Sequence, residues 1–321
     1  MNKPLKITLG VLGLLVAAAG GFFVWASVTS SRILASTIET HRVEFPIPFP
    51  LDRPVEATDP WVDAADPAME RAVASGQHLV EARYACIECH GPNFGGGVMV
   101  DDPLIGRLLG PNLTLGQGSR TLDYAPADWD RIVRHGIKPD GTPSPMPAED
   151  FQLMSDQELS DIIAYIRSMP PVDNEVPPIR LGPLGKVLMA TGELVLSADL
   201  IGTHATAHLE FPPDAEVSAE FGRHLAGVCS GCHGADLSGG PIPGGDPSWA
   251  PARNLTPHED GLEGWSYEDF STAMLSGRRP DGSDLVAPMT LMLPYAQGMT
   301  EVELQALWAY LESVPSVPDP E

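Results

Sequence analysis

The sequence predicts a helix-rich protein in which an apolar amino-terminal helix precedes two copies of one domain. Three observations lead to this prediction. Residues 7–28 form an uncharged, apolar run. The words ACIECHGPNFGGG (residues 85–97) and VCSGCHGADLSGG (residues 228–240) repeat one CxxCH motif. Each repeat then closes on an amphipathic helical word, SDQELSDIIAYIRSMP in the first and TEVELQALWAYLESVP in the second.

The apolar run from Ile7 to Val28 is long enough to cross a bilayer. It contains 22 residues (28 − 7 + 1) and would measure about 33 Å as a helix. Lys3 and Lys6 precede it, so the positive-inside rule places the amino terminus in the cytoplasm and the rest of the chain on the periplasmic side. A cleaved signal peptide is the alternative, but the run exceeds a usual signal core and WASVTSSR lacks an obvious A-x-A site. We therefore predict an uncleaved anchor in the cytoplasmic membrane over residues 1–28.

The charges and the few cysteines exclude several kinds of partner and site. The chain has 43 acidic against 19 basic residues and a net charge of −24. This balance disfavours nucleic acid and anionic lipid as partners, because both are polyanions, and it favours a basic protein partner. All four cysteines lie in the two CxxCH words, so none remains for a long-range disulfide or a separate nucleophile.

Composition divides the chain beyond the anchor into four parts. Residues 29–70 are rich in proline, as in FPIPFPLDRP, which predicts a tether lying on a domain surface. Two helix-rich blocks follow, over residues 71–172 and 216–321, and a connector over residues 173–215 joins them. A connector of this length is seldom featureless in a compact protein, so we expect it to pack along both domains.

The helices of the two blocks carry matching signals. Both closing helices begin at a capping box, formed by Ser155 with Glu158 and by Thr300 with Glu303. The opening helices carry Gly76 and Gly222, and the closing helices carry Tyr165 and Tyr310. This pairing predicts a close helix crossing in each block, with an aromatic residue against a glycine.

Four chemistries compete for a CxxC pair: a zinc knuckle, a thiol redox centre, a structural disulfide and covalent haem attachment. Zinc ribbons place their pairs closer together than Cys89 and Cys229, which are 140 positions apart (229 − 89). A redox centre calls for a βαβ context, whereas the flanking pattern is helical. Disulfides explain neither the fixed gap nor the histidine that follows both times. Haem c explains both, since Cys86 and Cys89, or Cys229 and Cys232, can bond one porphyrin while the adjacent imidazole faces the iron.

The second axial ligand of each iron follows from spacing. Met146 lies 56 residues after His90 (146 − 90), and Met289 lies 56 residues after His233 (289 − 233). Both follow a proline and precede the closing helix. Met292 is the alternative ligand in the second block. Thioether sulfur is a soft ligand that favours ferrous iron and raises the reduction potential.

The other histidines are weaker candidates for ligands. His135 falls at a helix end before a glycine, which favours a helix-terminal role. His78 and His224 recur on the opening helices as packing or surface residues. His204 and His208 lie in the connector, and a metal site there is the minor interpretation.

Both blocks also contain an Asn-Leu-Thr word, headed by Asn112 and Asn254. These words formally match glycosylation acceptors. Their recurrence favours instead a loop that hydrogen-bonds its own backbone or a haem propionate.

The two blocks resemble membrane-anchored di-haem class I cytochromes c. The second carries AEFGRHLAGVCSGCHGADLSGGPIP, ARNLTP, GRRPDGS and ELQALWAYLESVP, and the first carries GPNLT, IVRHGIKPDG and MPAEDFQLMSDQELSDIIAYIRSMPPVDNEVP. The resemblance implies an all-α fold for each of two tandem class I cytochrome c domains, low-spin His/Met iron and one-electron transfer. The chain is also similar to cytochrome subunits of membrane-bound alcohol and sugar dehydrogenases, which typically carry three haem motifs against two here. Where the family often has Met-Pro, the second block has Met289-Thr290.

These features predict an electron carrier rather than an enzyme. Two covalently bound haem c groups would pass single electrons from a membrane or periplasmic donor to a cytochrome or oxidase. The alternative is the electron-accepting cytochrome subunit of a membrane-bound alcohol or sugar dehydrogenase. A di-haem peroxidase is disfavoured because it needs an open iron position, and a thiosulfate dehydrogenase-like site because no cysteine is spare.

Overall fold

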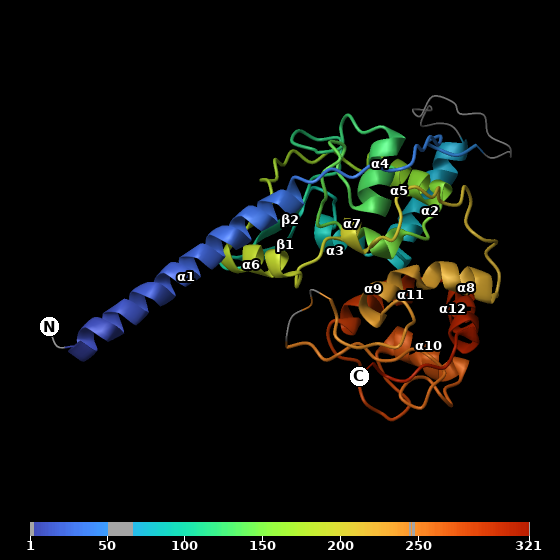
Figure 1. Ribbon diagram of the computed structural model, residues 1–321. Coiled ribbons are helices and arrows are strands. Elements are labelled where there is room, and N and C mark those ends of the chain that lie inside the picture. Colours follow the sequence, from blue (N-terminus) through green and yellow to red (C-terminus); the bar gives the residue numbers. More distant parts are fainter. Residues whose placement is uncertain (1–2, 51–66, 244, 246–247, 321) are drawn as a thin grey trace.

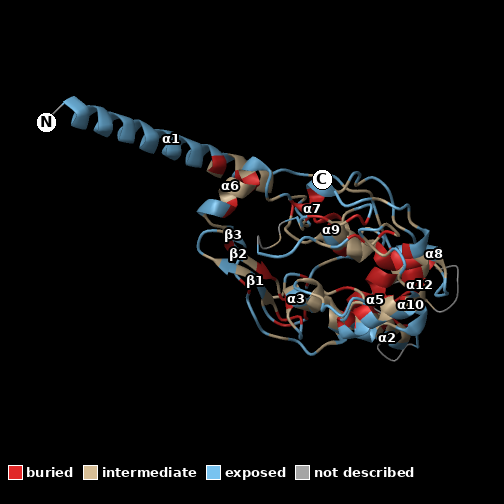
Figure 2. Cartoon of the chain, turned by 90° about the horizontal axis from the view of Figure 1, so that it is seen from below, coloured by how far each residue is buried: buried red, intermediate tan, exposed pale blue. Residues whose placement is uncertain are grey.

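The computed structural model describes residues 3–50, 67–243, 245 and 248–320 (Figure 1). One long helix, α1, projects from a body in which the first helix-rich block lies against the second. Buried residues concentrate where α5, α8 and α12 meet, whereas most of α1 is exposed (Figure 2).

Helix α1 spans Lys3–Leu34 and therefore continues past Val28. It is long and apolar enough to cross a membrane, a property that anchors and signal sequences share. Near its carboxyl end Ala26 and Ser30 are buried, and the helix packs against α6 (Pro183–Thr191) of the connector. The exposed part of α1 is thus free to lie in lipid, and its carboxyl end is held by the body.

The proline-rich segment after α1 enters the core of the first block. Phe45, Ile47 and Phe49 are buried in the same cluster as Leu159 and Ile163 of the closing helix. The expectation of a tether lying on the surface is wrong for these residues, because their three large apolar side chains gain more by burial than by exposure. Residues 51–66 of the predicted tether lie outside the described part of the chain.

The two blocks repeat one order of helices. The first contains α2 (Pro67–Ala82), α3 (Cys86–His90), α4 (Pro126–His135), the 3-10 turn η1 (Ala148–Phe151) and α5 (Asp156–Ser168). The second contains α8 (Ala219–Leu225), η2 (Ala226–Cys229), α9 (Ser230–His233), α10 (Tyr267–Ser276), η3 (Met289–Met292), α11 (Leu293–Gly298) and α12 (Glu301–Ser313). Both predicted capping boxes are present, at Ser155 and at Thr300.

Opening and closing helices cross at the predicted glycines. A Cβ added to Gly76 would overlap the carbonyl oxygen of Asp161 and approach the Cβ of Tyr165 to 2.8 Å. At Gly222 the corresponding overlap is with the carbonyl oxygen of Ala306. The crossing that the repeat predicts is therefore confirmed in both blocks, because only glycine lets these backbones approach so closely.

A small sheet departs from the expected all-α fold. Strands β1 (Gly97–Asp102) and β2 (Gly106–Gly110) form an antiparallel hairpin, and β3 (Arg180–Leu181) of the connector adds to β2. The turn is held by Asp102, whose Oδ1 accepts from the amides of Leu104 and Ile105 at 2.7 and 2.8 Å. Helices still dominate, but β1 contains the β-branched Val98 and Val100, which favour strands.

The connector lies along the first block through the contacts described. Besides β3 and α6 it contains α7 (Ser197–Leu200), which packs against η1. Farther on, the carbonyls of Leu209 and Glu210 accept from the first amides of α5, at 2.8 and 3.0 Å. The connector thus supplies partners for helix-terminal N–H groups that would otherwise be unsatisfied.

Candidate functional site

Each CxxCH word forms a single helical turn directly after an opening helix. Helix α3 ends at His90 and α9 ends at His233, and each is followed by a glycine with positive φ, 76° at Gly91 and 80° at Gly234. Three residues farther on, Phe94 and Leu237 both adopt a left-handed φ, 55° and 61°. The backbone that follows the two motif histidines is therefore duplicated at these positions, although Cys86 lies in α3 and Cys229 ends the 3-10 turn η2.

Both motif histidines are oriented by a backbone carbonyl. The Nδ1 of His90 lies 3.1 Å from the carbonyl oxygen of Pro111, and the Nδ1 of His233 lies 2.7 Å from that of Arg253. A carbonyl can only accept, so each Nδ1 carries the proton and each Nε2 keeps a lone pair. Burial lowers the pKa of both imidazoles from its ordinary value, which favours the neutral ring. Each histidine is thus prepared as a metal ligand through Nε2.

The four motif cysteines are free thiols. Burial raises the pKa of Cys86 and of Cys229 to about 12, and it raises the pKa of Cys89 and Cys232 as well. The thiols are therefore neutral at about pH 7. Two thiols that are not paired in a disulfide and an oriented imidazole, close together on one turn, are the groups that covalent haem attachment uses.

The predicted methionine ligands lie in the loops before the closing helices. Met146 is half-buried against the first core, and Ser197 of α7 donates to its carbonyl oxygen at 2.6 Å. Met289 begins η3 and Met292 ends it, and both are half-buried. Burial does not distinguish the two, so Met289 remains the prediction on spacing and Met292 its alternative.

Known families match both blocks. Residues 71–166 match the model of cytochrome c oxidase, cbb3-type, subunit III, and residues 219–315 match the model of cytochrome c. The chain contains two cytochrome c domains. We call the block that contains α2–α5 the first domain and the block that contains α8–α12 the second.

Relatives of the whole chain carry names of dehydrogenase subunits. The cytochrome c subunit of the quinone alcohol dehydrogenase of Gluconacetobacter polyoxogenes is 29% identical over 290 residues, which cover 79% of this chain and 58% of the relative. The gluconate 2-dehydrogenase cytochrome c subunit of Pantoea cypripedii is 28% identical over 287 residues, covering 78% of this chain and 61% of the relative. The fructose dehydrogenase cytochrome subunit of Gluconobacter japonicus is 23% identical over 269 residues, covering 77% and 53%. The chain thus spans between half and two thirds of the length of these relatives.

Cytochrome c domains carry covalently bound haem c, and the residues of both domains fit that group. The fit rests on the free thiols and on the unprotonated Nε2 of His90 and His233, since a haem iron binds a neutral imidazole. The Asn-Leu-Thr loops serve another purpose. Asn112 and Asn254 are buried, and each donates from Nδ2 to a carbonyl of the segment after the closing helix at 2.7 Å. The glycosylation interpretation is wrong because both side chains are buried. The expected bond to the loop's own backbone is confirmed, because the amides of Thr114 and Thr256 donate to Oδ1 of Asn112 and Asn254 at 3.0 and 2.8 Å.

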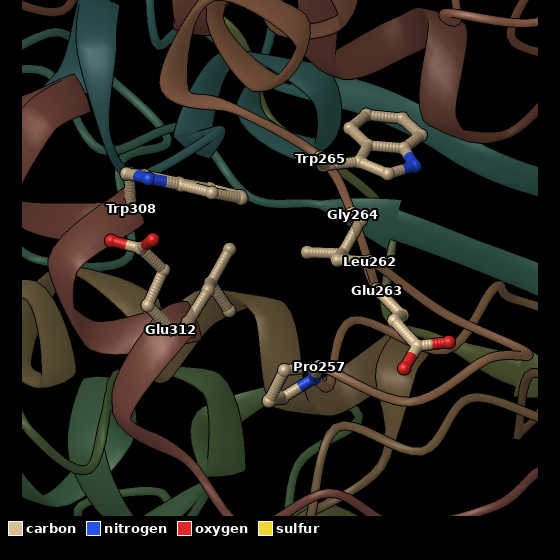
Figure 3. Close-up of a pocket in the computed structure, with 8 residues that line it drawn as sticks. Pro257, Leu262, Glu263, Gly264, Trp265, Trp308 and Glu312 are labelled. Carbon is tan, nitrogen blue, oxygen red and sulfur yellow. The ribbon is translucent and has the colours of Figure 1, made fainter.

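A shallow pocket in the second domain lies apart from these groups. Its volume is about 200 Å³, and it lies between α12, which contributes Trp308 and Glu312, and the loop that carries Glu263 and Trp265 (Figure 3). No motif cysteine, histidine or candidate methionine lines it. The pocket therefore does not mark the haem site.

Sequence reasoning missed two sets of residues. The first set is the carbonyls of Pro111 and Arg253, which directly precede the Asn-Leu-Thr words. Because such a word follows each motif histidine, its recurrence in both blocks could have pointed to these residues. The second set joins His41, Asp130 and His135 to His208; of these the sequence had offered only His208 as a metal ligand, together with His204 and in its minor interpretation. It assembles residues from three segments that only the tertiary fold brings together.

Proposed function

We propose that the chain is a di-haem electron carrier anchored to the cytoplasmic membrane, with both haem domains on the periplasmic side. Cys86, Cys89 and His90 would hold the first haem, and Met146 would be its second axial ligand. Cys229, Cys232 and His233 would hold the second haem, with Met289, or alternatively Met292, opposite. The observation that carries the proposal is the duplicated turn in which His90 and His233 each donate from Nδ1 to a backbone carbonyl.

Bound haem would supply a one-electron couple between ferric and ferrous iron. The protein residues bind and orient it. The carbonyls of Pro111 and Arg253 fix the imidazole tautomers, and Met146 packs against the apolar core of the first domain, where its thioether would be shielded from water. If His90 with Met146, and His233 with Met289 or Met292, held the two irons, neither iron would have an open position for substrate. This supports a carrier without catalytic chemistry of its own, rather than a di-haem peroxidase.

Both motifs lie at the boundary between the domains, which supports electron exchange between the haems. Glu88 of the first motif accepts from the Oη of Tyr295 in the second domain at 2.8 Å. Gly231 of the second motif lies against the carboxylate of Asp150 in the first domain. Each motif therefore touches the other domain.

The partner is proposed from charge and from the relatives. Residues 216–321 contain 16 acidic and 4 basic residues, against 13 and 8 in residues 71–172. A basic electron-transfer protein would therefore dock mainly on the second domain. The alternative is an electron-accepting role in a membrane-bound alcohol or sugar dehydrogenase, which the names of the relatives favour.

The ferric absorption spectrum of the purified protein tests the proposal. The intensity of the weak charge-transfer band from methionine sulfur to iron is divided by the haem concentration, and the haem concentration is divided by the protein concentration. Two haems per chain, both with methionine, are expected. One methionine-ligated iron would contradict a pure carrier and favour an enzyme with an open site. One haem per chain would contradict the di-haem assignment.

A further inference from the structure

Four buried side chains converge in the first domain away from the CxxCH motif. His41 comes from the segment after α1, Asp130 and His135 come from α4, and His208 comes from the connector. Their side chains are 7%, 1%, 1% and 6% exposed. One nitrogen or oxygen of each lies within 4.8 Å of the corresponding atom of every other. Three segments distant in sequence thus meet at one cluster.

Two of the imidazoles are fixed in one tautomer by backbone carbonyls. The Nδ1 of His208 lies 3.0 Å from the carbonyl oxygen of Gln152, and the Nδ1 of His41 lies 3.4 Å from that of His204. Carbonyl oxygens only accept, so both Nδ1 atoms are protonated and both Nε2 atoms carry lone pairs.

A third imidazole, that of His135, is fixed through His204. The Nε2 of His204 donates to the carbonyl oxygen of Ala198 at 2.9 Å, so the Nδ1 of His204 accepts. The Nδ1 of His135, at 3.0 Å, must then donate to it. The Nε2 of His135 consequently carries a lone pair too.

These assignments place lone pairs against lone pairs. The Nε2 atoms of His135 and His208 are 3.2 Å apart with no proton to share. The Nε2 of His41 and the Oδ2 of Asp130 are buried without a hydrogen-bond partner among the described residues. Leaving such groups unpaired in the interior is costly. A cation between them satisfies all four.

The separations suit a tetrahedral ion. The Nε2 atoms of His41, His135 and His208 lie 3.9, 3.7 and 3.7 Å from oxygens of Asp130. Ligands about 2.0–2.1 Å from a tetrahedral zinc ion are about 3.3–3.4 Å from one another. These three separations exceed that value by a few tenths of an ångström, and no pair of ligand atoms in the cluster is more than 4.8 Å apart. Closing the shell therefore requires a contraction of at most about 1.4 Å between any two ligand atoms.

The surrounding charges favour a cation over an extra proton. Arg134 bonds to Asp130 at 2.6 Å and to Asp156 at 2.7 Å, so one guanidinium faces two carboxylates and one negative charge is left over. The hydrogen bonds at Nδ1 leave the Nε2 of His135 and of His208 with a lone pair, as in an imidazole that binds a metal.

We propose that His41, Asp130, His135 and His208 form a structural zinc site, distinct from the haem irons. Three imidazoles and one carboxylate, closed and buried, match the donors and geometry that zinc prefers, and each histidine has the outer hydrogen bond that orients such ligands. The ion would fasten the segment after α1 and the connector to α4. It would thereby fix the first domain relative to the membrane helix.

Metal analysis of the full-length holoprotein tests this inference without reference to electron transfer. The protein is purified in detergent, equilibrated with zinc, passed through metal-free buffer, and analysed for zinc and iron per chain. About one zinc ion per chain is expected, and X-ray absorption at the zinc edge should show four nitrogen or oxygen ligands at about 2.0–2.1 Å and no sulfur. Absence of bound zinc, sulfur in its shell, or copper or nickel retained there instead would overturn the assignment.

Variants locate the ion. His208→Gln and Asp130→Asn should each lose the zinc while iron content and the haem spectrum stay unchanged. His258→Gln is the matched control, because His258 pairs only with Asp260 at 3.1 Å on the surface of the second domain. Full retention of zinc by both variants would overturn the site. If Asp130→Asn fails to fold, His208→Gln and the absorption data from the unaltered protein still decide.

Discussion

The imidazole Nε2 of His224 lies 2.8 Å from the carboxylate of Glu158, and this pair joins the second domain to the first. Glu158 also completes the capping box of α5. The same relationship recurs in the opposite direction, because His78 of the first domain lies 2.9 Å from Glu303, which completes the capping box of α12. Each opening helix therefore binds the helix cap of the other domain, so the interface has a local two-fold character.

Arg83 lies between these two pairs. It contacts Glu158 at 3.0 Å and Glu303 at 2.6 Å. Its counterpart in the second domain, three residues before the first motif cysteine, is Ala226. A single guanidinium thus serves two buried carboxylates that the repeat generates.

Replacing Arg83 with alanine should destabilise the protein by about 3–5 kcal/mol, because two buried carboxylates lose their shared cation. The free energy of unfolding of the holoprotein in urea measures this change. Arg107→Ala is the control, since the pair of Arg107 with Asp101 is half-exposed and should contribute less than about 1 kcal/mol. Equal effects of the two substitutions would contradict the role given to Arg83.

The interface should weaken in acid. Burial alone would raise the pKa of Glu303, but the hydrogen bond from His78 and the charge of Arg83 lower it from 4.5 to about 2. The pKa of Glu158 is lowered in the same way by His224 and Arg83, against the effect of burial. Because the folded-state pKa lies below the unfolded value, this stabilisation is complete above about pH 4.5 and is lost as the pH falls toward about 2.

Glu303→Gln isolates this effect from other carboxyl groups. Its free energy of unfolding should fall less steeply than that of the unaltered protein between about pH 5 and about pH 3. Glu268→Gln, at an exposed position of the second domain, should follow the unaltered protein. If the free energy of unfolding of Glu303→Gln fell with pH in parallel with that of the unaltered protein, the Glu303 carboxylate would not be the cause of the acid sensitivity.

The close helix crossings predict that adding even one methyl group at Gly76 or Gly222 destabilises the protein. Gly76→Ala and Gly222→Ala should each destabilise by about 1–3 kcal/mol, although alanine is the better helix former by about 1 kcal/mol, because the added methyl meets backbone rather than a movable side chain. Gly202→Ala is the control, since nothing lies within 4 Å of its Cβ position. Chemical unfolding compares the three, and a stabilised Gly76→Ala would show that the helices separate readily.

Features set by neighbouring residues were predictable from the sequence. The capping boxes at Ser155 and Thr300 depend on residues three positions apart, and the crossings at Gly76 and Gly222 were visible because the repeat presents each twice. The hydrogen bond from His90 to Pro111 depends on a loop closing back on its own motif, so spacing alone did not specify it.

Features set by packing between distant segments were not predictable. Proline-rich composition suggested a surface tether, yet Phe45 and Phe49 complete the first core by packing with Leu159 and Ile163 of α5. His78 and Glu303 are separated by 225 positions and meet only because the domains face each other. The sequence shows which residues recur in both domains, but not that the histidine of one domain pairs with the glutamate of the other.

Electron exchange with a basic acceptor should slow as salt is added. The acidic excess of residues 216–321 attracts such a partner over a distance that shrinks from about 30 Å at 0.01 M to about 8 Å at 0.15 M ionic strength. Stopped-flow oxidation of the reduced protein by a basic soluble cytochrome measures the rate. An acidic cytochrome of similar potential is the control and should show the opposite trend. A rate that does not change with salt would contradict electrostatic docking.

Methionine substitutions should identify which methionines are the axial ligands. Met146→Ala should reduce the sulfur-to-iron charge-transfer band to about half, because one of two thioether ligands is removed, and lower one of the two reduction potentials. If Met289 is the second ligand, Met289→Ala has the same effect on the other haem and Met292→Ala leaves the band intact. Met154→Leu is the control, because Met154 is buried just before the N-cap of α5 and bears no predicted ligand role. An intact band in Met146→Ala would contradict the ligand set in the first domain, and loss of the band in Met292→Ala alone would transfer the second site from Met289 to Met292.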